Sequence, residues 1–388
     1  MGSRSRFVIC SALVTALAVA ALATPAAGKG AGARQRAAKV AAAVRAVMAE
    51  AAIPGAIVGV WQRGEAPLVE ALGSRSFDPA TGQAGPPNMN PRLLMRIGSE
   101  TKTFVATAVL QLVGEGRVGL EDPISKYVNG VPNGEHITVR ELGEMRSGLV
   151  EFTDNEAWEA EYLAAPGRSW KPRQLLAASF SLPPSFPPGQ GYEYSNTNYV
   201  LLGLLVEKVS GEGIGPYVER HILAPLQMEQ TSMPTGAEFP QPHPNGFTLQ
   251  PLEKTVVNAT KWNFSWAWST GTMVSDLHDM RIWAKAVATG TLLRPAVQRQ
   301  RERFLPFPFA PQSGYGFGLF DVGGWIGHDG AVPGFESLTV YLPSKQATMV
   351  ILINSDAEIE SNIKLGEVVS RVITPAHPFS FGSPTPTP

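Results

Sequence analysis

Apolar residues recur along the chain at two spacings, and each spacing predicts a different kind of element. Apolar positions three and four residues apart predict helices, over residues 36–52, 99–113, 196–209, 276–289 and 358–372. Short apolar runs between turn residues predict strands, over residues 56–61, 68–72, 337–342 and 347–353. Because only a short Arg-Gly-Glu turn separates the first two runs, we expect them to form a hairpin.

The predicted strands lie towards the two ends of the chain, with helices between them. A doubly wound parallel sheet would need strands and helices that alternate throughout. The pattern instead predicts the α+β class, with an antiparallel sheet built from both termini, flanked by helices and carrying an inserted helical region. The chain has 388 residues, of which 44% are hydrophobic, so it can bury the core of one large or two moderate domains.

The two ends of the chain differ in composition from the segment between them. Residues 1–28 contain two arginines, an apolar stretch over 7–22 and small residues over 23–28, which is the layout of an export signal. We expect cleavage between about Ala23 and Gly28 and a secreted or cell-envelope (periplasmic) protein; an uncleaved membrane anchor is the alternative. A Gly/Ala linker over 28–33 then leads to a folded domain over 36–374. Residues 375–388 are rich in Pro, Ser and Thr, which predicts a disordered tail.

Charge and cysteine content exclude several classes of function. The formal net charge is −1 and the chain has no long basic run, so nucleic acid is not an expected partner. The only cysteine, Cys10, lies in the signal, so the mature protein has no disulfide and no cysteine nucleophile. The six histidines form no close pair at metal-ligand spacing, and we expect no metal. No Gly-x-Ser-x-Gly motif occurs, which argues against a nucleophile elbow.

Ser99 and Lys102 form the first candidate catalytic motif. Three residues apart at the start of an apolar helix, they share one face of its first turn. A hydroxyl at a helix N-terminus, beside an amine that can take its proton, is a plausible nucleophile. The simpler interpretation is a capping serine with a solvated lysine. The chain also holds a second Ser-x-x-Lys match at Ser361 and Lys364, so the motif alone does not decide.

Two later stretches carry further candidate chemistry. Tyr194 and Asn196 lie two residues apart in a loop before an apolar helix, where a phenol could transfer a proton and an amide could bind a carbonyl. His328, Asp329 and Gly330 lie just before a predicted strand, and we expect an edge strand whose glycines let a substrate approach closely. The alternatives are a core tyrosine with a capping asparagine, and an ordinary turn with an exposed histidine.

Taken in order, these three motifs resemble the serine penicillin-recognising family: class C β-lactamases, serine D-alanyl-D-alanine carboxypeptidases and related esterases. The similarity extends over about residues 40–373 and includes the segments 111–116, 120–127, 137–142 and 202–207. It selects Ser99 as the nucleophile and leaves Ser361 as a surface helix residue. The resemblance implies a β-lactamase/transpeptidase-like fold.

The resemblance also implies roles for individual residues. Ser99 would attack a carbonyl to form an acyl-enzyme, while Lys102 and Tyr194 share proton transfer, and which of the two is the base stays open. Asn196 would orient the substrate and Lys102. The oxyanion would be bound by the backbone N–H groups of Ser99 and Ala331. The implied substrate-binding residues are Asn196, His328, Asp329, Gly330 and Ala331. No metal or organic cofactor is implied.

The sequence departs from the family pattern at three places. Met-Arg-Ser-Gly stands at 145–148, where His-Thr-Ser-Gly is usual, so packing beneath the site should differ. Asp329 stands where threonine is common, and Ala331 replaces a residue that often carries a hydroxyl. If both side chains face the cleft, they weaken binding of a substrate carboxylate.

A further feature is a group of three tryptophans, which could line an apolar acyl pocket, although core packing is the more common role of such residues. They are Trp262, Trp266 and Trp268.

The resulting prediction is an exported serine hydrolase that acts through acyl-Ser99 and is D-alanyl-D-alanine carboxypeptidase-like or β-lactamase-like. Its partner would be a small-molecule or peptide substrate: an acyl-D-amino acid, a β-lactam or an ester. One alternative is an esterase or amidase that uses the same site on a substrate without a carboxylate. The other is a non-catalytic penicillin-binding-like protein. A membrane would be contacted only through the uncleaved signal.

Overall fold

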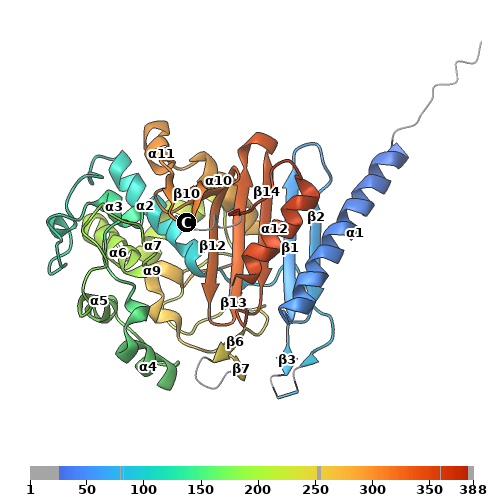
Figure 1. Cartoon of the computed structure of the whole chain (residues 1–388), viewed down its shortest axis with the longest axis horizontal. Coiled ribbons are helices and arrows are strands. Elements are labelled where there is room, and N and C mark those ends of the chain that lie inside the picture. Colours follow the sequence, from blue (N-terminus) through green and yellow to red (C-terminus); the bar gives the residue numbers. More distant parts are fainter. Residues whose placement is uncertain (1–25, 79, 82, 251–254, 359, 383–388) are drawn as a thin grey trace, which may run out of the picture.

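The structure is a computed structural model and describes residues 26–382, except 79, 82, 251–254 and 359. Its centre is an eight-stranded antiparallel sheet in the order β2-β1-β14-β13-β12-β11-β10-β9 (Figure 1). The strands are β1 (Gly55–Gln62), β2 (Leu68–Gly73), β9 (Leu305–Phe307), β10 (Ala310–Tyr315), β11 (Phe320–Val322), β12 (Trp325–Val332), β13 (Phe335–Leu342) and β14 (Ala347–Ile353). Both ends of the chain contribute strands, which confirms the predicted α+β class.

Helices cover both faces of the sheet. On β13, Leu338 lies against Gly366 of α12 (Ser361–Ile373), while Tyr341 packs against Ala284 and Ala288 of α10 (Leu277–Thr289). Leu338 and Tyr341 are three residues apart in a strand, so their side chains point to opposite faces. Because both faces are covered, every residue of β13 and β14 is buried. The helix α1 (Ala26–Glu50) packs beside α12, and its first half extends beyond the sheet (Figure 1).

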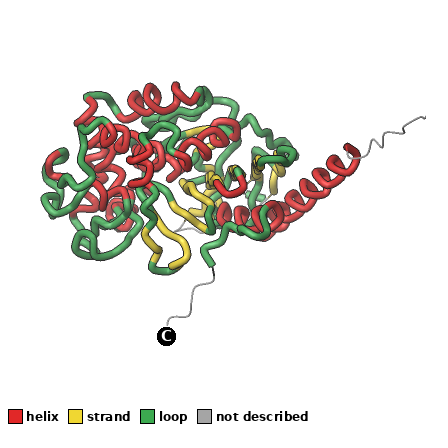
Figure 2. The backbone as a smooth tube through the Cα atoms, turned by 90° about the horizontal axis from the view of Figure 1, so that it is seen from above, coloured by secondary structure: helices red, strands yellow, loops and turns green. Residues whose placement is uncertain are grey.

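The remaining helices form the predicted inserted region at the other end of the sheet (Figure 2). They are α2 (Thr101–Gly114), α3 (Val139–Gly143), α4 (Glu156–Ala164), α5 (Pro172–Phe180), α6 (Asn196–Ser210), α7 (Ile214–Val218), α8 (Ala224–Leu226), α9 (Trp268–Gly271) and α11 (Pro295–Arg301). Three short strand pairs lie outside the main sheet: β3 (Phe77–Asp78) with β4 (Gln83–Ala84), β5 (Met95–Arg96) with β8 (Val274–Ser275), and β6 (Phe247–Gln250) with β7 (Thr255–Asn258). Helix α2 is buried against α6 and α9, so its N-terminus is held rigidly beside the sheet.

The predicted helix boundaries hold closely for α6 and α10. Gly211 ends α6 in the left-handed conformation at φ 80°. The Asp276 side chain caps α10 by accepting a hydrogen bond from the Asp279 backbone N–H. The linker predicted over 28–33 is wrong, because α1 already begins at Ala26. Residues 1–25, which hold most of the predicted signal, lie outside the described residues; within those described, no helix combines the length and apolar character that crossing a bilayer requires.

The prediction of a disordered tail over 375–388 is wrong for residues 375–382. Phe379 is fully buried, and its backbone N–H donates a hydrogen bond of 2.8 Å to the Ser370 hydroxyl. The Trp325 indole donates to the His377 carbonyl at 2.9 Å, and Phe381 packs against Phe320. Composition predicted disorder from Pro, Ser and Thr, but two phenylalanines supply enough apolar surface to fix the segment on the sheet. Residues 383–388 lie outside the described part of the chain.

Candidate active site

Ser99 lies in a single 3-10 turn, Gly98–Glu100, that leads directly into α2. Gly98 has a φ of +49°, and a Cβ at this position would lie 2.6 Å from the backbone nitrogen of Ala331. The turn is therefore pressed against β12, and only glycine allows that approach. This arrangement brings Ser99, from the first motif, next to Ala331, from the third.

Lys102 is fully buried in the first turn of α2 and points at Ser99. Its ammonium group donates hydrogen bonds to Ser99 Oγ at 2.8 Å and to the Thr270 carbonyl at 2.9 Å. Burial lowers the pKa of Lys102 to about 7, while the carboxyl groups of Glu151 and Asp329 oppose the shift. A substantial fraction of Lys102 is thus a neutral amine near pH 7, able to accept the Ser99 proton.

Tyr194 lies beside the Lys102 amine. The Lys102 Nζ is 4.9 Å from the centroid of the Tyr194 ring, and the Tyr194 hydroxyl is buried without a hydrogen-bond partner among the described groups. Burial, with the charge of Asp329, raises the pKa of Tyr194 well above its ordinary value, against the opposing effect of the Ser99 hydroxyl. Tyr194 is therefore a neutral phenol, suited to relay a proton rather than to start the reaction as a base.

Asn196 begins α6 and lines the same cavity as Ser99. Its backbone N–H donates to the carboxylate of Glu151, a buried residue that sequence reasoning missed. Within the described residues, the hydrogen bonds of Lys102 go to Ser99 and Thr270 and none goes to Asn196, so the predicted role of Asn196 in orienting Lys102 is not seen. The charge of Glu151 acts on Lys102 instead. No local pattern around Glu151 marks it, because its partner is 45 residues away.

The unusual segment at 145–148 lies beneath this site. The Ser147 hydroxyl donates to the Asn198 side-chain oxygen on α6 and accepts the Leu149 backbone N–H at 3.0 Å. The Asn198 amide in turn contacts Met145 Sδ at 3.4 Å. The segment therefore supports the start of α6, which carries Asn196.

His328 is buried on β12, hydrogen-bonded through both ring nitrogens. Its Nδ1 lies 2.6 Å from the Asp329 carbonyl, which can only accept, so Nδ1 carries the proton and Nε2 accepts from the Tyr315 hydroxyl at 2.9 Å. Burial and the charge of Lys102 lower the pKa of His328 to about 3. This histidine is a neutral, fixed part of the wall. The alternative of an exposed histidine in an ordinary turn does not hold, because Tyr315 of β10 and Phe320 of β11 pack against His328.

The sequence had suggested that His328 lies on an edge strand, but the strand that carries it, β12, is not at the edge. It lies inside the sheet, between β13 and β11. However, β11 pairs only with residues Trp325–Gly327, so the part of β12 from His328 to Val332 has a strand partner on the β13 side alone. This stretch leaves a local edge open beside Ser99.

The open edge faces a cavity of about 620 Å³ that contains Ser99. Phe307, Phe309, Phe320 and Phe381 give it an aromatic wall, to which Tyr192 and Tyr315 add their rings. Its charged lining among the described residues consists of two carboxyl groups, Asp329 and Glu360. The Asp329 side chain is 37% exposed, and desolvation raises its pKa against the opposing effects of Lys102 and Asn362.

The tryptophans suggested for an acyl pocket do not line the Ser99 cavity. Trp266 packs edge-on to Trp158 at a centroid distance of 5.9 Å, and Trp262 packs edge-on to Tyr162 at the same distance. Trp268 lies against Gly203 of α6. The core-packing interpretation therefore holds for this group, although Trp262 and Trp266 also border a different cavity described below.

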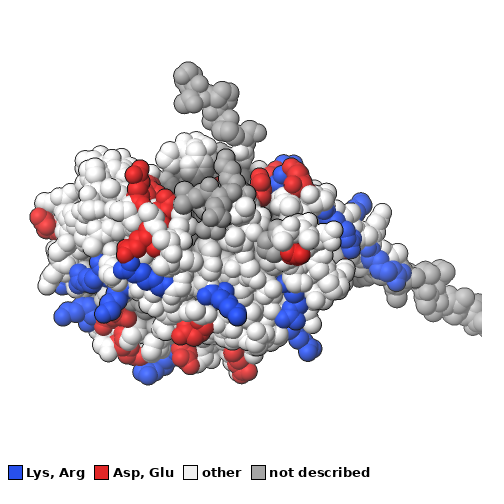
Figure 3. Space-filling model, turned by 90° about the horizontal axis from the view of Figure 1, so that it is seen from below, with Lys and Arg blue, Asp and Glu red and all other residues white. Residues whose placement is uncertain are grey.

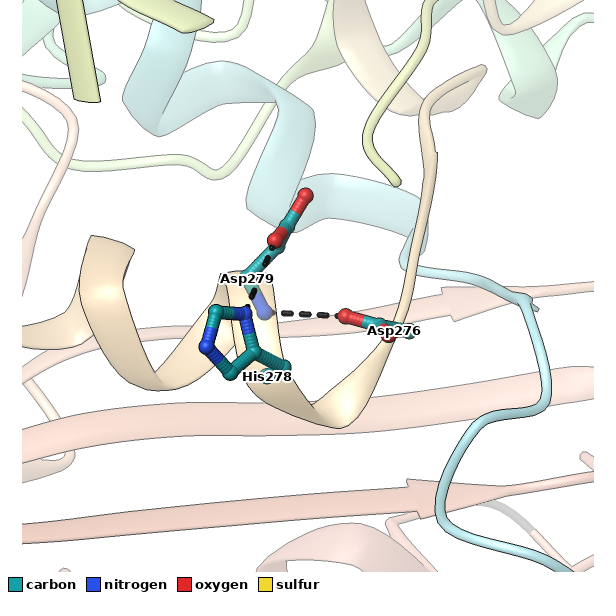
Figure 4. A group of neighbouring side chains, drawn as sticks. All are labelled: Asp276, His278 and Asp279. Atoms are coloured by element: carbon teal, nitrogen blue, oxygen red, sulfur yellow. Dashed lines mark hydrogen bonds and ion pairs between the residues drawn. The ribbon is translucent and has the colours of Figure 1, made fainter. Parts of the chain in front are cut away.

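Two other groups of chemically capable residues have structural roles. Asp276, His278 and Asp279 gather at the N-terminus of α10 (Figure 4), but Asp276 caps the helix and Asp279 Oδ2 accepts from Gln230 N and Thr231 Oγ1. In the second Ser-x-x-Lys match, Lys364 pairs with Glu50 at 2.6 Å on the surface. Ser361 is buried rather than on the surface as predicted, because its hydroxyl folds back onto the Glu358 carbonyl.

The fold and this arrangement of serine, lysine and tyrosine define a serine hydrolase of the β-lactamase/transpeptidase fold. The Beta-lactamase family model matches residues 40–371. The structure superimposes on a D-stereospecific amidohydrolase from Streptomyces sp. with a TM-score of 0.75 and 30% identity, over 86% of this chain and 98% of the other. For the D-amino acid amidase of Ochrobactrum anthropi SV3 the TM-score is 0.71 and the identity 27%, over 86% and 97% of the two chains.

Curated proteins match as well. PbpX of Bacillus subtilis (strain 168), whose name places it among penicillin-binding proteins, is 29% identical over 284 residues, which is 73% of this chain. The chain spans 66% of the length of PbpX, just under two thirds. The protein belongs to the Beta-lactamase family.

Proposed function

We propose that the protein is an exported amidase that hydrolyses small amides through an acyl-enzyme on Ser99. The observation that carries this proposal is the charge of the Ser99 cavity, whose described charged lining is acidic and consists of Asp329 and Glu360. A substrate carboxylate there would be repelled, whereas a free ammonium group would be attracted. The aromatic wall suits an apolar or aromatic side chain. The amide of an aromatic amino acid meets both requirements, and the names of the amidase neighbours support the D configuration.

The proposed reaction uses three side chains in turn. The neutral Lys102 amine takes the Ser99 proton while Ser99 Oγ bonds to the amide carbon, and the backbone N–H groups of Ser99 and Ala331 bind the oxyanion. Tyr194 gives its proton to the leaving nitrogen and recovers one from the Lys102 ammonium as the C–N bond breaks, releasing ammonia. Water then attacks the acyl-Ser99 carbon by the same route in reverse, which frees the acid and restores the three residues.

The pH dependence of activity follows from the buried lysine. Because Lys102 must be neutral to act as the base, we expect kcat/KM to rise about tenfold per pH unit below about 7 and to level off above it. In Glu151→Gln the loss of a carboxylate that favours protonated Lys102 should move this acid limb to lower pH, by about one unit or less. The glutamine oxygen can still accept the Asn196 N–H. Stopped assays across pH 5–9 check the shift; an unchanged limb would remove Glu151 from this role.

The activity itself is tested with matched substrates. We expect release of ammonia from D-phenylalanine amide by the purified protein and none by Ser99→Ala, with slower hydrolysis of the N-acetyl derivative because it lacks the ammonium group. A second candidate is penicillin binding or carboxypeptidase activity, favoured by the similarity to PbpX. Faster turnover of an acyl-D-Ala-D-Ala peptide than of the amide, or a penicillin adduct on Ser99 by intact mass without amide turnover, would select that candidate. If neither substrate is hydrolysed and no penicillin adduct forms, the remaining interpretation is a non-catalytic binding protein.

Substrate choice should respond to a single substitution, Asp329→Thr. Removing the carboxylate is expected to raise KM for D-phenylalanine amide about tenfold, since a hydrogen bond to a charged group contributes about 1.5 kcal/mol or more. The same change should raise activity on acyl-D-Ala-D-Ala, whose carboxylate is no longer repelled. Rates are compared above the acid limb, because Asp329 also acts on Lys102. An unchanged KM together with no gain on the peptide contradicts the proposal for Asp329.

A further inference from the structure

A second cavity, of about 630 Å³, takes no part in the proposed reaction. It lies where α4, the β6–β7 hairpin and the end of β12 meet. Aromatic side chains form much of its lining: Trp158, Tyr162, Trp262 and Trp266.

Residues that line the second cavity are close in sequence to residues that line the Ser99 cavity. Ala331 lines the Ser99 cavity and Pro333 lines the second, so two residues of extended chain, about 7 Å, separate them on this side. On the opposite side, Glu151 holds the backbone of Asn196 at the first cavity, and Asp154, three residues later, lines the second. A ligand in the second cavity therefore lies within a few residues of the reaction site.

The rings of the second cavity are set at angles to one another. Tyr162 is perpendicular to Trp262, with an interplanar angle of 82° at 5.9 Å, and tilted by 60° against Trp266 at 5.4 Å. Trp158 stacks on Tyr162 at 5.4 Å. The rings contact one another in pairs, and together they form one wall of the cavity, called the aromatic box below. A cation that lies against such a wall is attracted by the negative faces of the rings.

The charged residues that line the second cavity are acidic. Asp154, Glu159 and Asp356 line the cavity, and within the described residues none of its lining is basic and none of these three forms an ion pair. Figure 3 views the molecule from below Figure 1, the side on which α4 lies, and shows both acidic and basic side chains on this face. Asp154 and Glu159 are exposed at the mouth.

Asp356 lies deeper, where it accepts the Gly334 N–H at 2.8 Å and the Thr248 hydroxyl at 3.2 Å. Burial raises the pKa of Asp356 to about 6, so the carboxylate is mostly charged at neutral pH, and it has no ion-pair partner among the described residues. Tyr162, which is 6% exposed, has a hydroxyl without a partner among the described groups. The buried cation that acts on Tyr162 is Arg96, and its guanidinium is already held between the rings of Phe239 and Phe264.

We propose that this second cavity binds an organic ammonium group, held by the aromatic box and by the carboxylates of Asp154, Glu159 and Asp356. The aromatic faces attract a cation that lies over them, and the carboxylates supply the opposite charge. A neutral ligand of the same shape would gain only the apolar contact. The proposal concerns binding and does not depend on the amidase assignment.

Calorimetric titration of the full-length protein with choline and with its neutral isostere 3,3-dimethylbutan-1-ol tests this directly. We expect choline to bind with a dissociation constant of about 1 mM and at least about tenfold more tightly than the alcohol. Trp262→Leu should weaken choline binding about tenfold, because Trp262 is half-buried at the box and its loss leaves the core rings in place. Glu159→Gln, at an exposed position, gives a second variant that does not disturb folding and should weaken choline binding severalfold.

A matched control separates the two cavities. Asp329→Asn removes a carboxylate from the Ser99 cavity and should leave the choline affinity unchanged. Loss of binding in Asp329→Asn but not in Trp262→Leu would place the ammonium in the catalytic cavity and overturn the proposal. Equal affinity for choline and the alcohol would also overturn it, as would the absence of any heat at tens of millimolar choline. None of these outcomes depends on amide hydrolysis.

Discussion

Replacing Lys102 by methionine is expected to lower kcat by about four orders of magnitude without lowering the melting temperature. The methionine fills the same space but has no amine to accept the Ser99 proton, and losing a positioned base together with nucleophile activation costs about 10⁴-fold. Lys102 is fully buried, so its side chain has no alternative position in solvent. Steady-state rates and a thermal melt of the same preparation check both halves of the expectation.

The stability half of this prediction follows from proton linkage. The pKa of Lys102 falls from 10.5 to about 7 on folding, so below pH 7 burial of the amine opposes folding by about 5 kcal/mol. Stability of the unmodified protein should therefore rise between pH 7 and 10.5, and this rise should vanish in Lys102→Met. Methionine leaves the Thr270 carbonyl without its donor, which costs about 1–3 kcal/mol and offsets part of the gain.

The chain offers its own control in the second Ser-x-x-Lys match. Lys364→Met removes a half-exposed lysine whose ion pair with Glu50 lies on the surface, and such pairs contribute about 1 kcal/mol or less. Activity should be unchanged. A comparable loss of kcat in both lysine variants would contradict the assignment of Lys102 as the base. A collapse of the melting temperature in Lys102→Met alone would contradict the destabilising effect ascribed to the buried amine.

Sequence reasoning predicted the contacts that are local in the chain. Ser99 and Lys102 are three residues apart on one helical turn, so their contact follows from helix geometry. The order of the motifs then selected Ser99 over Ser361. The hairpin of β13 and β14 is equally local, because its apolar strands and its turn are adjacent in the chain.

The contacts that tune this chemistry come from distant parts of the chain. The Thr270 carbonyl that holds Lys102 is 168 residues away from it, and Glu151 is 45 residues from Asn196. Phe381 reaches the Ser99 cavity from a segment whose composition indicated disorder. A buried carboxylate in a loop has no periodic or compositional signature, so only the folded chain shows that Glu151 faces Lys102. The open part of β12 likewise depends on how short β11 is, which its sequence does not mark.

Gly330→Ala is expected to be the second most damaging substitution, and its effect is steric. A Cβ at residue 330 would lie 2.0 Å from the Ile97 carbonyl oxygen and 2.8 Å from the Ser337 hydroxyl, which itself donates to that carbonyl at 3.0 Å. The turn that carries Ser99 and β12 would have to move apart, since the nearer obstacle is the backbone carbonyl of Ile97. Overpacking of this kind costs about 1–3 kcal/mol, and a displacement of about 1 Å at a reacting centre costs about 100-fold in rate.

Gly114→Ala is the matched control for this change, because it makes the same substitution at the last residue of α2, at the end of the helix away from Ser99. A Cβ there would meet nothing nearer than Val297 Cγ2 at 3.6 Å, so alanine should be neutral or stabilise by about 0.5 kcal/mol through its higher helix propensity. We therefore expect Gly330→Ala to lower both the melting temperature and kcat, with the loss of kcat persisting well below the unfolding transition. Full activity at low temperature would show that the Ser99 turn tolerates a wider separation from Ala331, and the oxyanion site would then have to be assigned to other donors.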